Sequence, residues 1–174
     1  MKRILIACTV ISFSIGSPIR SQTAIINISQ RNTLSLNGRW NYIVDPYETG
    51  YYEYRYVPYD KKPEPRGGFF LDKKPENKSE LIEYSFDMSP TLLVPGDWNS
   101  QEDKLLYYEG TIWYRKEFDY QKSSPENRVF AYFGSVNYES HVYLNGKKLG
   151  IHIGGFTPFS YEITHLVREK DNSL

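Results

Sequence analysis

Cysteine is almost absent from this sequence, because Cys8 is the only one in 174 residues. A disulfide framework within the chain is therefore excluded, and a folded domain must rely on its apolar core. The histidines are also few, and His141, His152 and His165 do not have the spacing of metal ligands. We therefore expect neither a metal ion nor another cofactor.

An excess of charge of one sign is missing as well. The formal net charge is zero, and removing residues 1–22, which carry Lys2, Arg3, Arg20 and no acid, leaves 18 basic against 21 acidic side chains. A weakly acidic body gives no electrostatic reason to expect nucleic acid or an anionic membrane as a partner. The apolar run from Ile4 to Ile15 is too short to span a membrane as a helix.

The N-terminus has instead the order of an export signal. Two basic residues precede the apolar run, and the small residues Ser14, Gly16 and Ser17 offer a cleavage site. We interpret residues 1–22 as a signal peptide for export to the periplasm or the extracellular space, and residues 23–33 as a leader into the domain. The residue types before Cys8 resemble a lipid-attachment site, but so few apolar residues precede it that we expect no lipid anchor.

Aromatic side chains are abundant, with 16 Tyr, 9 Phe and 3 Trp. From residue 138 to 144 the sequence alternates as in a strand: Tyr138, Ser140, Val142 and Leu144 would share one face, and Glu139, His141 and Tyr143 the outer one. We expect a structural hydrogen bond for His141. Asn145-Gly146 then predicts a type I′ hairpin turn, which needs positive φ at both central residues. Alternation over residues 159–164 predicts a further strand.

Similar patterns predict strands earlier in the chain, over residues 36–44, 91–94, 111–118 and 129–133. In the third of these, Arg115 falls on the face opposite to Ile112 and Tyr114. In the fourth, Phe130 and Tyr132 make both faces apolar, as for a central strand. Short strands joined by turn residues, with no convincing helix, predict an all-β protein, an antiparallel β-sandwich.

Residues 47–89 interrupt this pattern. Six of the sixteen tyrosines lie between Tyr47 and Tyr59, and several prolines, glycines and lysines follow. Long loops in compact domains are usually functional or disordered. Interleaved Tyr and Arg side chains could stack on bases or on sugar rings, but large aromatics more often serve tertiary packing. We expect this excursion to pack over the edge of its own domain.

Four sequence blocks carry a family resemblance: NGRW near residue 38, VPGDWN, GTIWYRKEF, and the stretch ending in GGFTPFSYEIT. In this order they resemble the N-terminal sugar-binding domain of glycoside hydrolase family 2, which includes β-glucuronidases, β-galactosidases and β-mannosidases. The resemblance extends over residues 34–174. It implies a jelly-roll-like, galactose-binding-domain-like β-sandwich, followed in the same chain by an immunoglobulin-like domain and a TIM barrel that carries two catalytic glutamates.

Neither glutamate motif of the family occurs in this sequence, and a barrel takes about 250 residues by itself. We therefore expect a fragment without catalytic residues, inactive alone, in which residues 166–174 lead into a strand that the chain does not complete. A sandwich truncated at its C-terminal strand has an unpaired edge, which predicts poor stability in isolation.

The family resemblance also suggests where substrate contacts lie. In the family the loop before the WYRKEF-like strand approaches the active site of the barrel. Tyr108 or Glu109 is therefore expected to contact the carbohydrate, a β-glycoside, in the intact enzyme. Asp97 is expected to hold a turn by bonding an amide two residues on. Glu117 and Asp119 share a strand face, but catalysis also needs a pocket and perturbed pKa values, so we expect solvated side chains.

Two classes of function remain open from the sequence. In one, the chain is the N-terminal portion of a secreted, exo-acting retaining glycosidase of the β-glucuronidase or β-galactosidase type. In the other, it is a non-catalytic carbohydrate-binding or interaction module that uses the Tyr47–Tyr59 cluster, or the product of a truncated gene. Two barrel glutamates encoded in frame downstream would decide for the first.

Overall fold

The computed structural model describes residues 25–77, 79–81 and 84–174. The predicted signal peptide and Cys8 lie outside these residues. Within them, no helix has both the length and the apolar character needed to cross a membrane.

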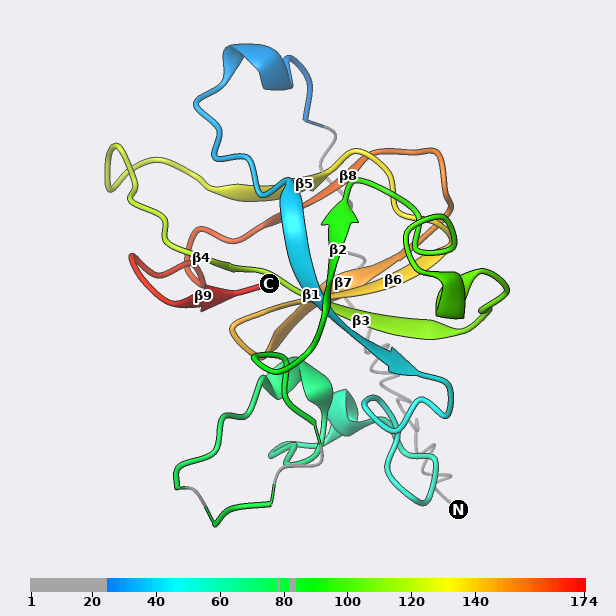
Figure 1. The fold of residues 1–174 in the computed structure, drawn as a ribbon. Helices are drawn as coiled ribbons and strands as arrows, with labels where there is room; N and C mark the ends of the chain where they lie inside the picture. The colour runs from blue at the N-terminus through cyan, green and yellow to red at the C-terminus, as the bar shows by residue number, and fades with distance from the viewer. Residues whose placement is uncertain (1–24, 78, 82–83) are drawn as a thin grey trace, which may run out of the picture.

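The described chain consists of short strands joined by loops and four single 3₁₀ turns (Figure 1). The strands are β1 (Gly38–Asp45), β2 (Thr91–Val94), β3 (Thr111–Arg115), β4 (Glu117–Phe118), β5 (Phe130–Phe133), β6 (Glu139–Leu144), β7 (Lys147–Ile153), β8 (Phe159–Glu162) and β9 (Asn172–Ser173). The 3₁₀ turns are η1 (Ile28–Gln30), η2 (Tyr59–Lys61), η3 (Phe69–Leu71) and η4 (Asp103–Leu105).

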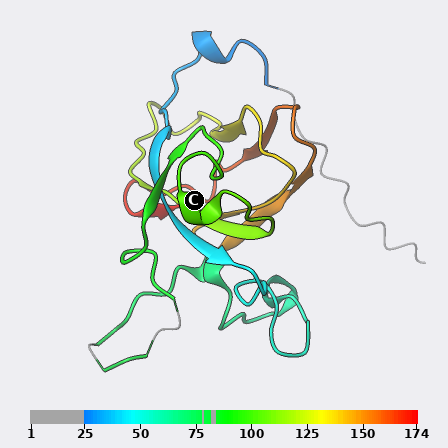
Figure 2. The same ribbon diagram turned by 45° about the vertical axis from the view of Figure 1, so that its right-hand side comes forward.

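All the strand pairs are antiparallel, as predicted for this fold class. One sheet has the order β2-β1-β3, and the other pairs are β4 with β9, β5 with β8 and β6 with β7. Figures 1 and 2 show the strands wrapped around a common centre. In both views residues 25–34 extend from one end of this body and the excursion from the opposite end. The fold is an antiparallel β-sandwich.

The predicted hairpin is confirmed. Strands β6 and β7 pair from Glu139 opposite Ile153 to Leu144 opposite Lys147. The turn residues Asn145 and Gly146 have φ values of 51° and 77°, the left-handed region that a type I′ turn requires. One register shift, between Val142 and Tyr143, marks a β-bulge, which increases the local twist of the hairpin.

Two apolar clusters form the core. The larger is built from β6, β7, β8 and the residues beside them, with Val129, Val142, Leu144, Leu149, Phe159 and Ile163 buried. The smaller lies between the three-stranded sheet and the loop after β2, with Tyr42, Leu92 and Leu105 buried. Strands β1, β6 and β8 supply four of these nine side chains, Tyr42, Val142, Leu144 and Phe159.

The prediction of outward-facing side chains was wrong at two positions. Tyr143 and Arg115 were expected to point outward, yet they are only 7% and 4% exposed. The excursion covers both: the Phe70 ring stacks on Tyr143 at 4.4 Å between centroids, and Asp72 accepts a 2.8 Å hydrogen bond from Arg115. This confirms that part of the excursion packs over its own domain.

Strand β5 also differs from the prediction. Among the described residues it pairs with β8 alone, from Phe130 opposite Glu162 to Phe133 opposite Phe159. Tyr132 is correspondingly exposed. Interpreting β5 as a central strand was therefore wrong, because it has a single partner strand within the described chain, and on its second face Tyr132 meets solvent while Phe130 is half-buried.

Candidate functional site

The loop between β2 and β3, residues 95–110, carries the two substrate contacts expected from the sequence. Side chains within the loop hold its shape. The Trp98 indole donates to the Tyr108 carbonyl at 3.2 Å, and the Asn99 amide donates to the Leu105 carbonyl at 2.6 Å. Gln101 bridges back to β2, accepting from the Leu93 amide at 2.7 Å. The VPGDWN block is thus the internal scaffold of this loop.

Asp97 holds the turn at the start of the loop. Its carboxylate accepts hydrogen bonds from the Ser100 amide and the Ser100 hydroxyl, both at 2.8 Å. These hydrogen bonds lower the pKa of Asp97. The predicted role as a turn residue is confirmed, and the residue that bonds the carboxylate most closely is Ser100, three positions on rather than two.

The structure gives Tyr108 and Glu109 different surroundings. The Tyr108 hydroxyl donates to the Thr111 carbonyl at 2.9 Å, and burial raises the pKa of Tyr108. Gly110, with φ of 152°, lies against the same side chain: a Cβ there would come within 2.6 Å of the hydroxyl oxygen. Glu109 is exposed, and its neighbour Tyr107 is 90% exposed.

Tyr107 is a residue of this loop that sequence reasoning did not single out. Two adjacent tyrosines carry no signal that says which one turns inward. Gly110 leaves the space that the folded-back ring occupies, but a glycine in the sequence does not say which of the two tyrosines fills that space. Of the three residues at the end of this loop, 107–109, Tyr107 and Glu109 are the exposed ones and so are available to a ligand.

The carboxylates Glu117 and Asp119 do not act together. Glu117 forms an ion pair with Lys74 at 2.8 Å and lies 3.7 Å from Arg115. Asp119 accepts a hydrogen bond from the Asp171 amide at 3.0 Å. Each carboxylate therefore serves a separate structural contact, and neither is held against the other as an acid–base pair.

The histidines have structural surroundings. His141 lies 2.8 Å from Glu139, as the expected hydrogen bond requires, and Tyr51 packs against its ring with 4.8 Å between centroids. His152 is buried and stacks on Phe159 at 4.0 Å. No group of three or more His, Cys, Asp or Glu side chains is arranged to hold a metal ion in the part of the chain that the structure describes.

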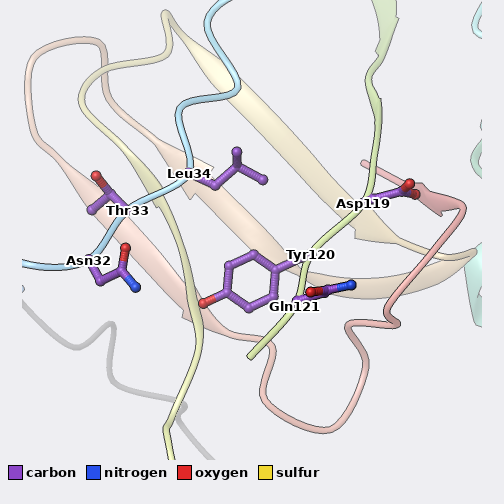
Figure 3. Close-up of a pocket in the computed structure, with 6 residues that line it drawn as sticks. All are labelled: Asn32, Thr33, Leu34, Asp119, Tyr120 and Gln121. Carbon is purple, nitrogen blue, oxygen red and sulfur yellow. The ribbon is translucent and has the colours of Figure 1, made fainter. Parts of the chain in front are cut away.

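Two neighbouring hollows lie on another side of the domain. One, of about 240 Å³, is lined by Asn32, Thr33, Leu34, Asp119, Tyr120 and Gln121. Figure 3 shows the Tyr120 ring extending toward Asn32 and Thr33, whereas the Asp119 side chain points away. The other, of about 620 Å³, shares Tyr120 and Gln121 and continues along residues 167–169. Neither includes Tyr108 or Glu109, so the predicted contacts lie outside these two hollows.

Known proteins share sequence similarity with this chain. Residues 33–174 match the family model described as "Glycosyl hydrolases family 2, sugar binding domain". A β-glucuronidase of Formosa agariphila is 28% identical over 164 residues, which cover 87% of this chain and 14% of the relative. A β-glucuronidase of Streptococcus agalactiae is 40% identical over 97 residues, covering 53% of this chain and 15% of the relative.

A solved β-glucuronidase from an uncultured Clostridium species superposes with a TM-score of 0.55 and 26% identity, covering 79% of this chain and 20% of that structure. The chain thus spans only a small part of the length of each of these relatives. The family match covers most of this chain, and it includes β1 to β9 and the loop that carries Tyr108 and Glu109. The chain belongs to glycosyl hydrolase family 2, and its residues 33–174 form the sugar-binding domain of that family.

Proposed function

We propose that the chain is the N-terminal portion of an exported, exo-acting retaining glycosidase of the β-glucuronidase type. The observation that carries this proposal is the family match over residues 33–174. The β-glucuronidase relatives in sequence and in structure support the choice of β-glucuronides as substrates.

The chemistry assigns a supporting role to this domain. A retaining glycosidase needs two carboxyl groups about 5–5.5 Å apart, one to protonate the leaving oxygen and one to attack the anomeric carbon. Glu117 and Asp119 are engaged with Lys74 and with the Asp171 amide. The catalytic pair belongs, in this proposal, to a TIM barrel that follows an immunoglobulin-like domain. The 95–110 loop would then present Glu109 and Tyr107 to the glycoside.

The test is hydrolysis by the protein extended through its downstream coding sequence. We expect cleavage of 4-nitrophenyl β-D-glucuronide in preference to the β-D-galactoside, with the β-anomer appearing first in proton NMR. A preference for the galactoside would overturn the assigned sugar, and the α-anomer as first product would overturn retention. Lack of hydrolysis by a folded protein, with no two barrel glutamates in frame, would refute the catalytic proposal and leave a binding module.

Export is tested separately with residues 1–30 fused to an alkaline phosphatase that is active only outside the cytoplasm. We expect phosphatase activity from this fusion. The matched control replaces Lys2 and Arg3 by glutamate, which removes the positive charge that precedes the apolar run. Equal activity of the two fusions, or no activity from the first, would overturn the signal-peptide assignment.

A further inference from the structure

The excursion contains a narrow hairpin, residues 51–59, that projects beyond the packed core. Its two arms meet at a bridge between Tyr52 and Pro58, and the Tyr59 amide donates to the Tyr51 carbonyl at 2.9 Å. At the tip, the Tyr56 amide donates to the Glu53 carbonyl at 2.8 Å, which closes a tight turn over Tyr54 and Arg55. We refer to Tyr54, Arg55 and Tyr56 as the hairpin tip.

The base of the hairpin is anchored on both sides. Glu53 forms an ion pair with Lys62, and Asp60, directly after the hairpin, forms one with Lys148 of β7. The Tyr51 ring packs edge-on against His141 of β6 at 4.8 Å between centroids. Contacts of this kind hold the base of the hairpin against the domain and so fix the direction in which the tip projects.

Backbone strain marks Tyr56. Its φ is 56°, in the left-handed region that glycine and asparagine adopt readily and bulky residues adopt at a cost. Such strain persists where the surrounding structure or a function requires it. The Tyr56 ring is 82% exposed, and the centroid of the Tyr52 ring is 6.4 Å from its own. Packing alone gives little reason for a tyrosine rather than a glycine at this position.

The tip is aromatic and positively charged. Tyr54 is also 82% exposed, and the Arg55 guanidinium lies 5.1 Å from the centre of the Tyr54 ring. The nearest acids along the chain are already paired, Glu53 with Lys62 and Asp60 with Lys148. Within the described residues Arg55 has no ion-pair partner. A cation is therefore left at the tip of a domain whose overall charge is weakly acidic.

Exposed rings next to an unpaired guanidinium suit a ligand that joins a flat apolar face to an anionic group. The apolar face of a pyranose ring packs on an aromatic ring, and a guanidinium binds a carboxylate with two parallel hydrogen bonds. We propose that the hairpin tip is an ancillary binding site for anionic, uronate-containing glycans, separate from the 95–110 loop. The proposal of this ancillary site rests on the proposed function, because a glycosidase that acts on uronate-bearing glycans would meet ligands of this class.

The binding test uses the 174-residue chain in affinity electrophoresis through gels that contain alginate, a polyuronate, with neutral mannan and dextran sulfate as comparison polymers. We expect retardation by alginate well above that by mannan. Tyr54→Ala, Arg55→Gln and Tyr56→Gly should each weaken retardation at least fivefold. The matched controls are Tyr47→Ala, a tyrosine 83% exposed outside the tip, and Lys61→Gln, an exposed cation next to the hairpin.

Tyr56→Gly separates binding from folding, because glycine relieves the strained φ while removing the ring. We expect its melting temperature to be equal to or above that of the parent while alginate retardation falls. Equal retardation of the parent and the three tip variants would overturn the site. Equal retardation by alginate and dextran sulfate would also overturn the site, because it indicates simple ion exchange. Self-association of the chain in sedimentation equilibrium, abolished by Tyr54→Ala, would overturn it as well, because the tip would then bind a second copy of the chain.

The same variants distinguish this proposal from the proposed function when they are placed in the extended protein. Hydrolysis of 4-nitrophenyl β-D-glucuronide should be unchanged by Tyr54→Ala, because the small glycoside does not need the tip. Absence of hydrolysis with alginate binding intact would refute the catalytic proposal alone. Hydrolysis without alginate binding would refute the ancillary site alone.

Discussion

The Tyr143 hydroxyl donates a 2.8 Å hydrogen bond to the carboxylate of Asp60, a residue 83 positions earlier in the chain. This contact joins the excursion to the turn end of the β6–β7 hairpin. Lys148 of β7 forms an ion pair with the same carboxylate, and the Phe70 ring stacks on Tyr143. The excursion is thus bound to the sandwich by specific polar contacts as well as by ring packing.

Replacing Asp60 by asparagine should destabilise the domain. The carboxylate has a side chain only 4% exposed and bonds both Tyr143 and Lys148. Hydrogen bonds to a charged group contribute about 1.5–3 kcal/mol, so we expect about 2 kcal/mol off the free energy of unfolding in urea. Glu64→Gln, at an exposed ion pair with Arg66, is the matched control and should change less than about 0.5 kcal/mol. Equal effects of the two variants would contradict the anchoring role of Asp60.

Arg115→Met should cost more. The guanidinium is buried and bonds Asp72 at 2.8 Å and also Asp87, so its removal leaves Asp72 without its cation and Asp87 with Lys74 alone, at 3.8 Å. Breaking a buried ion pair by removing one partner costs about 3–5 kcal/mol. We expect a loss near 3 kcal/mol, because Asp87 is half exposed. The control is Arg128→Met, at an exposed pair with Glu162, with an expected loss below about 1 kcal/mol.

Tyr143 and Arg115 show which contacts of the fold the sequence does not predict. The Asn-Gly turn and the alternation before it are local signals, so the β6–β7 hairpin and the face of β6 that carries Val142 and Leu144 follow from the sequence. Alternation identifies two faces of a strand but does not say what covers the second one. Tyr143 and Arg115 are covered by residues 83 and 43 positions away, and no local pattern in the proline- and glycine-rich excursion predicts those contacts.

In the candidate site, too, the sequence predicts the contacts between residues close in the chain and not the longer-range ones. The VPGDWN block predicts a turn, and the structure has the turn, because Asp97 and Ser100 are close in sequence. Which of Tyr107 and Tyr108 turns inward depends on the hydrogen bond to the Thr111 carbonyl and on the space left by Gly110. That choice is tertiary, so the sequence pattern alone leaves it open.

Acid should weaken the contact between β8 and the start of β5. Hydrogen bonds from Arg128 and Thr164 lower the pKa of Glu162 from its ordinary value of 4.5 to about 2. A lowered carboxyl pKa contributes stability that is present above the unfolded value and is lost as the pH falls through the folded one. We therefore expect melting temperature to decline between about pH 4.5 and pH 2. Glu162→Gln should flatten part of this decline, and an identical pH profile for this variant would contradict the assignment.

Tyr108→Phe and Glu109→Gln should separate loop shape from ligand contact in the extended protein. Tyr108→Phe removes the hydrogen bond to the Thr111 carbonyl, so we expect about 1 kcal/mol less stability. Glu109→Gln changes an exposed side chain, so its stability should match the parent. If the Glu109 carboxylate bonds the glycoside, its loss should lower kcat/KM for 4-nitrophenyl β-D-glucuronide by about tenfold, as expected for one charged hydrogen bond. An unchanged kcat/KM in Glu109→Gln, with Tyr107→Phe and Tyr107→Ala also unchanged, would exclude this loop from the substrate site.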